Sequence, residues 1–325
     1  MSELIDKFLQ ELNNESKQSP ERLEILRSLV MRVVELAELD ADTSDLRIAS
    51  KALNELLEAS ELFAEWRERP KLTVFGSART RSDSPLYEMA RQFSSEMAQR
   101  GWMTVSGAGP GIMEASAKGA GKESTLGVNI ELPFEQGANE FIDVDQMHVA
   151  MKFFFTRKVA MTRASHGFVA FPGGVGTMDE LFEILTLVHT GKTDPAPIVL
   201  IDEPTGTYWS SWLDFIDRSV IANGYLSDVD KCLFVLCTSV QDAIAQVESF
   251  YRNYRGFSIN NGRALVKVRQ PPTTQQLAAL AAQFPKFAVD DGFQIENDDE
   301  FSFSFDGRNY VSLRMLIDDV NAWTG

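Results

Sequence analysis

The chain has 325 residues, 44% of them hydrophobic and 24% charged, with a formal net charge of −16. That length suffices for one large domain or two ordinary ones. The excess of carboxylates argues against nonspecific binding to nucleic acid or to an anionic membrane surface, although it leaves room for a small anionic ligand. No apolar run approaches the roughly 20 residues of a membrane span, and the start of the chain resembles neither a secretory nor a transit sequence. We therefore expect a cytoplasmic protein.

Residues 1–70 consist almost entirely of helix-forming residues. Two amphipathic stretches, 21–39 and 45–66, are separated by "DADTSD" at 40–45, whose short polar side chains are typical of helix caps. The pattern predicts a helical hairpin. We interpret residues 1–70 as a helical arm that covers a sheet or joins subunits.

From residue 71 to residue 255, short apolar runs alternate with helical patterns. Ser84 is a typical N-cap, with Pro85 at the first helical position and Gly101 as the stop. We expect strands over 71–77, 102–107, 125–132, 169–171, 196–202 and 232–237, and helices over 84–101, 112–120, 149–165, 181–188, 208–221 and 239–254. This alternation predicts a doubly wound, parallel sheet of the Rossmann-like α/β class.

The alternation of apolar runs and helical patterns stops after residue 255. The pattern of residues 256–325 predicts a small α+β extension. Its expected elements are a strand at 264–272, a helix at 273–284, a half-exposed strand at 301–310 and a closing helix at 311–323. No motif in this extension indicates chemistry. The two cysteines, Cys232 and Cys237, have neither metal-ligand nor redox spacing, and we expect buried thiols.

Three expected strands end in glycine-rich turns, at 76–79, 107–111 and 173–177. Glycine permits positive φ and lets a ligand approach the backbone amides closely, and the start of the following helix favours a phosphate. One such turn can serve only to reverse the chain, but three at one sheet edge indicate a phosphate-bearing ligand. The expected contact residues in these turns are Gly76, Ser77, Gly107, Gly109, Gly173, Gly174, Gly176 and Thr177.

The standard nucleotide motifs do not fit. "GAGPGIM" lacks the spacing of the dinucleotide fingerprint, and "SAKGAGKES" departs from a P-loop at Ser116 and Glu123. An NAD- or ATP-binding protein remains the alternative at this point. The three histidines are dispersed and no carboxylate or cysteine cluster has ligand spacing, so we expect no metal.

Four segments together resemble the Lonely Guy family, which was long mislabelled as lysine decarboxylases. They are "VFGSART" at 74–80, "SGAGPGIMEA" at 106–115, "FTRKVAM" at 155–161 and "PGGVGTMDE" at 172–180. The resemblance covers residues 71–255, and it extends more weakly over the tail, which looks like the longer bacterial subgroup. It implies a nucleotide-binding catalytic domain and hydrolysis of the N-glycosidic bond of a purine or cytokinin nucleoside 5′-monophosphate, without a cofactor, in a homodimer or larger homo-oligomer.

The resemblance also implies a catalytic pair, Arg157 and Glu180. A carboxylate near C1′ suits an oxocarbenium-like transition state, and an arginine supplies a fixed positive charge. The amides of the turn at 173–177 would hold the 5′-phosphate, with Lys158 as a further binding residue and Glu114 at the ribose or base.

Simpler interpretations exist for the same residues. Arg157 and Lys158 fit a solvated helix face, and Glu114 fits the first turn of a helix. Thr177 and Glu180 have the spacing of a capping box. At the level of function, the alternative is a nucleotide sensor or carrier that does not cleave its ligand. A lysine decarboxylase would need a Schiff-base lysine and a cofactor site, for which no motif is present.

Overall fold

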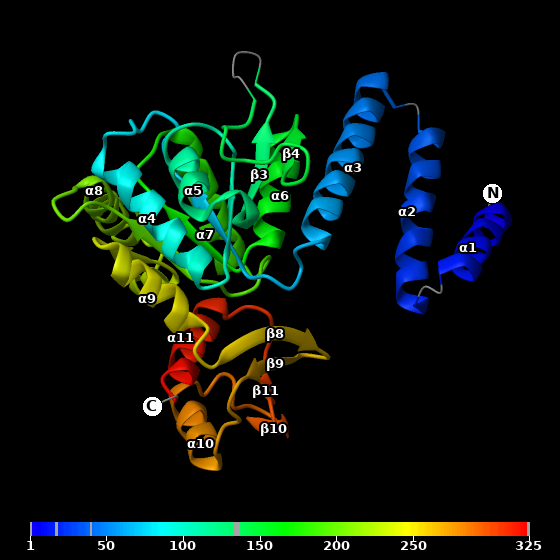
Figure 1. The fold of residues 1–325 in the computed structure, drawn as a ribbon. Coiled ribbons are helices and arrows are strands. Elements are labelled where there is room, and N and C mark those ends of the chain that lie inside the picture. Colours follow the sequence, from blue (N-terminus) through cyan, green and yellow to red (C-terminus); the bar gives the residue numbers. More distant parts are fainter. Residues whose placement is uncertain (1, 17–18, 40, 133–136, 324–325) are drawn as a thin grey trace. The chain divides into compact units, whose positions relative to one another are not determined.

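The structure is a computed structural model that describes residues 2–16, 19–39, 41–132 and 137–323 (Figure 1). The chain divides into two compact units, Met1–Leu57 and Glu58–Gly325. The domain boundaries that we place at 70 and 255 from the sequence stay predictions.

The first unit is helical. It contains α1 (Ser2–Ser16), α2 (Pro20–Glu38) and the first part of α3 (Thr43–Ala64). The side chain of Ser19 caps α2, and Arg27 of α2 pairs with Asp6 of α1 at 2.9 Å. The break between α2 and α3 is at the predicted position, and there Asp42 accepts a hydrogen bond from the backbone of Ser44. The separate helix α1 was not predicted.

The second unit is built on a seven-stranded, fully parallel sheet of order β4-β3-β2-β1-β5-β6-β7. Its strands are β1 (Lys71–Phe75), β2 (Met103–Ser106), β3 (Thr125–Ile130), β4 (His148–Met151), β5 (Gly167–Ala170), β6 (Ile198–Ile201) and β7 (Val235–Cys237). The chain winds outward from β1 to β4 and then returns to β5 beside β1, so the winding direction switches between β1 and β5. The predicted doubly wound α/β fold is therefore confirmed.

Helices cover both faces of this sheet. Alternate β1 residues point to opposite sides: Leu72 and Val74 enter one core and Phe75 enters the other. The Leu72 side is covered by α4 (Pro85–Gln99), α5 (Ile112–Ala120) and α9 (Val240–Phe250), and the Phe75 side by α6 (Phe154–Ala164), α7 (Val175–His189) and α8 (Tyr208–Phe215). A π-helical turn, Ile216–Ile221, continues α8, and short 3-10 segments occupy Lys122–Ser124 and Asp228–Leu233.

Most predicted elements of this unit are present, with two corrections. Residues 149–151 are not the start of a helix but part of strand β4, where Val149 and Met151 are buried while His148 and Ala150 are partly exposed. In so short an apolar run, a period of two is hard to distinguish from a helical stripe. The strand predicted at 232–237 is also shorter, because Cys232 lies in the 3-10 segment Asp228–Leu233, where its Sγ donates to the carbonyl of Val311 in α11 (Tyr310–Asn321).

The C-terminal part of this unit is a four-stranded antiparallel sheet, of order β10-β11-β9-β8, with two helices. The elements are β8 (Tyr254–Asn260), β9 (Arg263–Val268), α10 (Thr274–Gln283), β10 (Gln294–Asn297), β11 (Glu300–Ser304) and α11 (Tyr310–Asn321). Strands β8 and β10 were not predicted, because their residues are largely exposed and polar.

Strand β11 is not half-exposed as its alternating pattern suggests. Both serines that follow its phenylalanines are buried. Arg263 donates to Ser302 Oγ at 2.7 Å and 3.1 Å, and Ser304 Oγ donates to the carbonyl of Val289 at 2.9 Å. The serines are therefore covered by polar partners, which an alternation of polar and apolar residues does not reveal.

Candidate active site

The three glycine turns lie side by side, because they follow the adjacent strands β2, β1 and β5. Their backbones are joined directly. The amide of Ser77 in the first turn donates to the carbonyl of Pro172 at 3.2 Å, and the carbonyl of Ser77 accepts from the amide of Ile112 at 3.1 Å. The turns flank the switch point between β1 and β5, which is where ligands bind in open α/β sheets.

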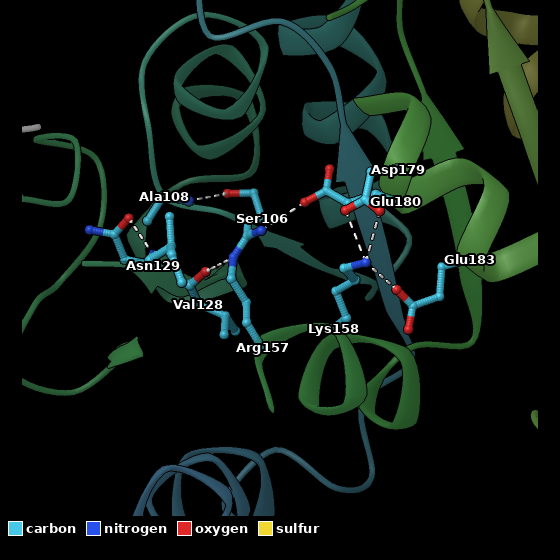
Figure 2. A network of polar contacts seen from close by, with 10 residues as sticks. Ser106, Ala108, Val128, Asn129, Arg157, Lys158, Asp179, Glu180 and Glu183 are labelled. Atoms are coloured by element: carbon cyan, nitrogen blue, oxygen red, sulfur yellow. Dashed lines mark hydrogen bonds and ion pairs between the residues drawn. The ribbon is translucent and has the colours of Figure 1, made fainter. Parts of the chain in front are cut away.

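Arg157 and Glu180 meet at this edge of the sheet (Figure 2). Arg157 projects from α6, and its Nη1 lies 2.8 Å from Oε1 of Glu180 on α7. Its Nε donates to the carbonyl of Val128 on β3 at 2.9 Å. With a side chain only 7% exposed, Arg157 is not part of a solvated helix face, and that simpler interpretation is wrong.

Gly107 forms a wall of the arginine site. A Cβ added at Gly107 would lie 2.1 Å from Nη2 of Arg157. Such an approach is impossible for any other residue without displacing the guanidinium, so the second glycine turn and Arg157 are fitted to one another.

Burial acts on the Glu180 carboxylate more strongly than its partner does. Desolvation raises the pKa of Glu180 above the ordinary range of a glutamate, while the charge and hydrogen bond of Arg157 lower it only in part. A raised pKa brings the carboxyl closer to neutrality, as suits a group that exchanges a proton during a reaction.

The third turn leads directly into α7, whose N-cap is Gly174. Thr177 is therefore the third residue of the helix rather than its cap, and Glu180 is bound to Arg157. The capping-box interpretation of Thr177 and Glu180 is wrong for this reason. The first amides of α7 have no acceptor within their own helix, and Gly174, Val175 and Gly176 are exposed.

Packing within the protein requires a glycine at only one of the three glycine positions in this turn. A Cβ at Gly173 would lie 2.1 Å from the hydroxyl oxygen of the buried Thr177, and the carbonyl of Gly173 accepts from the Tyr208 hydroxyl at 2.6 Å. At Gly174 and Gly176, by contrast, a Cβ would meet no atom of the described chain within 4 Å, and neither has a positive φ. The packing of the protein explains Gly173 and leaves the other two unexplained.

Protein packing also accounts for glycines in the other two turns. A Cβ at Gly76 would lie 2.6 Å from Ile112, and one at Gly109 would lie 2.8 Å from Met113. Ser77 is partly buried, and its hydroxyl accepts from the amide of Arg79 at 3.1 Å. These residues shape the site edge, and a role in binding remains a prediction.

Glu114 is held by a residue that the sequence did not bring to attention. It lies in the first turn of α5, where it accepts a hydrogen bond from the Tyr87 hydroxyl at 2.6 Å. Burial, and then the hydrogen bond to Glu114, raise the pKa of Tyr87 well above its ordinary range. Tyr87 thus remains a neutral donor that fixes the direction of the Glu114 carboxylate.

Lys158 directly follows Arg157 in the sequence, but its side chain is engaged elsewhere. Its Nζ lies 2.9 Å from Asp179 and 2.5 Å from Glu183, both on α7 (Figure 2). Partial burial lowers the pKa of Lys158, but the hydrogen bonds and charges of Glu183 and Asp179 outweigh it and the pKa is raised. The structure therefore places Lys158 in a bridge between α6 and α7.

Three contributors to this edge were missed from the sequence: Tyr87, Tyr208 and Asn139. The two tyrosines lie within predicted helices and belong to no motif. A buried hydroxyl generally needs a partner, and that requirement was the available signal. Asn139, whose side chain donates to the carbonyls of Ala108 and Gly109, lies in an irregular segment without any pattern.

In the described part of the chain, no group of three or more His, Cys, Asp or Glu side chains is arranged to hold a metal ion. Among the helices so described, none combines the length and apolar character needed to cross a membrane.

Comparison with known proteins gives concordant matches. Residues 96–247 match the family model described as "Possible lysine decarboxylase". The cytokinin riboside 5′-monophosphate phosphoribohydrolase of Mycobacterium tuberculosis is 30% identical over 165 residues, which cover 49% of this chain and 83% of that protein. The protein of the same name from Rhodococcoides fascians is 28% identical over 201 residues, covering 59% and 96%.

Among solved structures, the molybdenum cofactor carrier protein of Chlamydomonas reinhardtii matches with 22% identity and a TM-score of 0.40, covering 56% of this chain and 97% of that one. Nothing about the ligand of this chain follows from a match at that level. The relative from Mycobacterium tuberculosis, in contrast, is matched over most of its length. The range of the family model, 96–247, contains the Arg157–Glu180 pair and two of the three glycine turns. The chain belongs to the Lonely Guy family.

Proposed function

We propose that the chain hydrolyses the N-glycosidic bond of a purine or cytokinin nucleoside 5′-monophosphate, releasing the free base and ribose 5-phosphate. The observation that carries this proposal is the buried Arg157–Glu180 pair, with Nη1 and Oε1 at 2.8 Å, beside a helix start whose glycines leave open space. The names of the bacterial relatives support the same reaction.

The turn at 173–177 is the proposed phosphate site. The exposed amides at the start of α7 would donate to the phosphate oxygens, and the positive end of the helix would favour their charge. Gly174 and Gly176 keep clear the space that a phosphate needs. Because the phosphate is fixed, the ribose is held at a set position relative to Glu180, and binding energy is converted into orientation.

Glu180 is the proposed catalytic carboxylate. Arg157 binds its Oε1, which leaves Oε2 to face the ribose and the attacking water. As the bond between C1′ and the base nitrogen breaks, the electron pair goes to the base, and the carboxylate stabilises positive charge at the ribose. Water adds to C1′ and transfers a proton to Glu180, which later returns it to the solvent, and the base takes a proton to leave neutral.

The remaining proposed binding residues are inferred from their places in the turns around Arg157 and Glu180. Gly107 borders Arg157, and Gly109 lies in the same turn beside Met113. Gly76 and Ser77 lie in the neighbouring turn, and Glu114, fixed by Tyr87, is a candidate acceptor for the ribose hydroxyls or the base. Lys158 stays a candidate binding residue, although its Nζ is engaged by Asp179 and Glu183 on α7. Lys158 itself does not suit the part of a Schiff-base lysine, which needs a lowered pKa, because the pKa of Lys158 is raised.

The test is incubation of the chain with AMP, GMP, a cytokinin ribotide and adenosine, followed by chromatography of the released bases. We expect release from at least one monophosphate and at least about tenfold less from adenosine, because the nucleoside lacks the group that the turn binds. Equal turnover of adenosine and AMP would contradict the phosphate site. Tight binding of a monophosphate without any release would favour the sensor or carrier instead.

A further inference from the structure

The second glycine turn contains an alanine in a conformation that alanine seldom adopts. Ala108 has a φ of +62°, in the left-handed region where Cβ crowds the neighbouring carbonyl. Its side chain is completely buried and packs with Ala117 and Ile142. A non-glycine residue persists in this region only where its surroundings fix it.

Asn139 supplies most of that fixation. It reaches the turn from the segment between β3 and β4, and its side-chain Nδ2 donates to the carbonyls of Ala108 and Gly109, at 3.0 Å each. The backbone amide of Asn139 donates to the Ala108 carbonyl at 2.8 Å. Its Oδ1 accepts from the amide of Phe141 at 3.2 Å, which orients the amide group. Ser106 Oγ accepts from the Ala108 amide at 3.2 Å, so both polar groups of Ala108 are bound.

The conformation of this turn matters for the arginine. Ala108 is next to Gly107, where an added Cβ would lie only 2.1 Å from Arg157 Nη2 and 2.9 Å from Met113 Sδ. A turn that relaxed from the left-handed conformation would move the Gly107 backbone, and the guanidinium would lose the wall that now confines it. Its Nη1 is the atom that holds Glu180 at 2.8 Å.

We propose that Asn139 is a positioning residue for catalysis: it locks Ala108 in the left-handed conformation and thereby fixes Arg157 against Glu180. This proposal rests on the proposed function, because turnover is its readout. It assigns to Asn139, which lies between β3 and β4, a part in the reaction that is separate from the phosphate turn at 173–177.

The first experiment compares Asn139→Ala and Asn139→Asp with the wild-type chain. Aspartate keeps the acceptor for Phe141 but cannot donate to the two carbonyls. For both variants we expect kcat on the active monophosphate to fall about tenfold or more, as a misplaced catalytic group allows, while KM stays within about threefold because the phosphate turn is intact. The matched control is Asn223→Ala, which removes a bond from a side-chain amide to the Ser219 carbonyl on an exposed helical turn and should leave kcat unchanged.

The second experiment is rescue by Ala108→Gly. Glycine adopts positive φ without a clamp, so Ala108→Gly alone should retain kcat, and added to Asn139→Ala it should restore a measurable part of the lost turnover. Wild-type kcat in Asn139→Ala overturns the proposal. So does a loss of kcat that accompanies a lowered melting temperature and is not relieved by glycine. If Asn139→Ala does not fold, a folded and active double variant supports the proposal and an inactive one overturns it.

Different measurements test the reaction and the role of Asn139. Failure of the proposed function shows in the wild-type chain, which would release no base from any monophosphate. Failure of the role of Asn139 shows only in the variants of a chain that does release base.

Discussion

Arg157 and Glu180 are joined through one oxygen of the carboxylate, and the proposed mechanism uses the other oxygen. Glu180→Gln tests that chemistry at constant shape. Glutamine still accepts the bond from Arg157 Nη1, so we expect the melting temperature to change little and AMP to bind. We expect turnover to fall by about two orders of magnitude or more, because an amide neither accepts the proton nor stabilises a cation. The measurements are base release, nucleotide binding by calorimetry and thermal unfolding. A glutamine variant with full turnover would refute the mechanism.

The pKa of Glu180 predicts a pH dependence. A carboxylate must be ionised to act as proposed, and burial raises the pKa of Glu180. Activity should therefore be full above this raised pKa and fall as the pH decreases through it, with the acid limb above the usual glutamate range. The quantity to follow is kcat, which reports the bound complex, since the free phosphate of the substrate itself titrates near pH 6. An acid limb no higher than that of an exposed glutamate would contradict the assignment.

Gly176 allows a matched test of the phosphate site. Gly176→Ala and Gly256→Ala introduce the same methyl group at positions without positive φ, where the added Cβ would meet no other part of the described chain within 4 Å. The protein alone should tolerate both changes, and Gly176→Ala should if anything stabilise α7, by up to about 1 kcal/mol. We expect KM for the monophosphate to rise about tenfold or more in Gly176→Ala and to stay unchanged in Gly256→Ala. Equal KM values in the two variants would remove the argument for a phosphate at this turn.

At the scale of elements, Lys158 joins α6 to α7. If its bridge to Asp179 and Glu183 is its main role, Lys158→Met should destabilise the chain by about 1 kcal/mol, because Asp179 is half exposed and solvent weakens the pair. KM for the monophosphate should stay within about threefold. Thermal unfolding and steady-state kinetics on one preparation give both values. An unchanged melting temperature with a KM raised about tenfold would show instead that Lys158 contacts the nucleotide.

At the scale of the whole molecule, the sequence and the family resemblance predict at least a dimer. Helix α2, whose residues are all described, buries none of them, and Ile25, Leu29 and Val33 form an exposed apolar stripe at a spacing of four. Such a stripe is typical of a contact surface. We expect light scattering to show a dimer or larger at micromolar concentration, and Leu29→Glu to weaken it if α2 takes part. A monomeric wild-type chain at that concentration would contradict this prediction.

The sequence by itself determined the α/β class, most of the strands and helices, and the family. It did so because buried parallel strands are short apolar runs and because the glycine turns and the Arg157 and Glu180 motifs are local in sequence. A short local pattern does not always distinguish a strand from a helix. At β4, three apolar residues fit both equally well, and only pairing with β3 decided between them.

Only the tertiary structure decided which residues meet. Asn139 is about thirty positions from the carbonyls that it binds, Tyr87 is on a different helix from Glu114, and Lys158 faces α7 rather than the turns. The exposed strands β8 and β10 likewise exist because β9 and β11 pair with them. A hydrogen bond between distant segments needs only one asparagine or tyrosine at the position where the fold brings it. Such a contact, like the packing against Arg157, therefore gives no periodic pattern in the sequence.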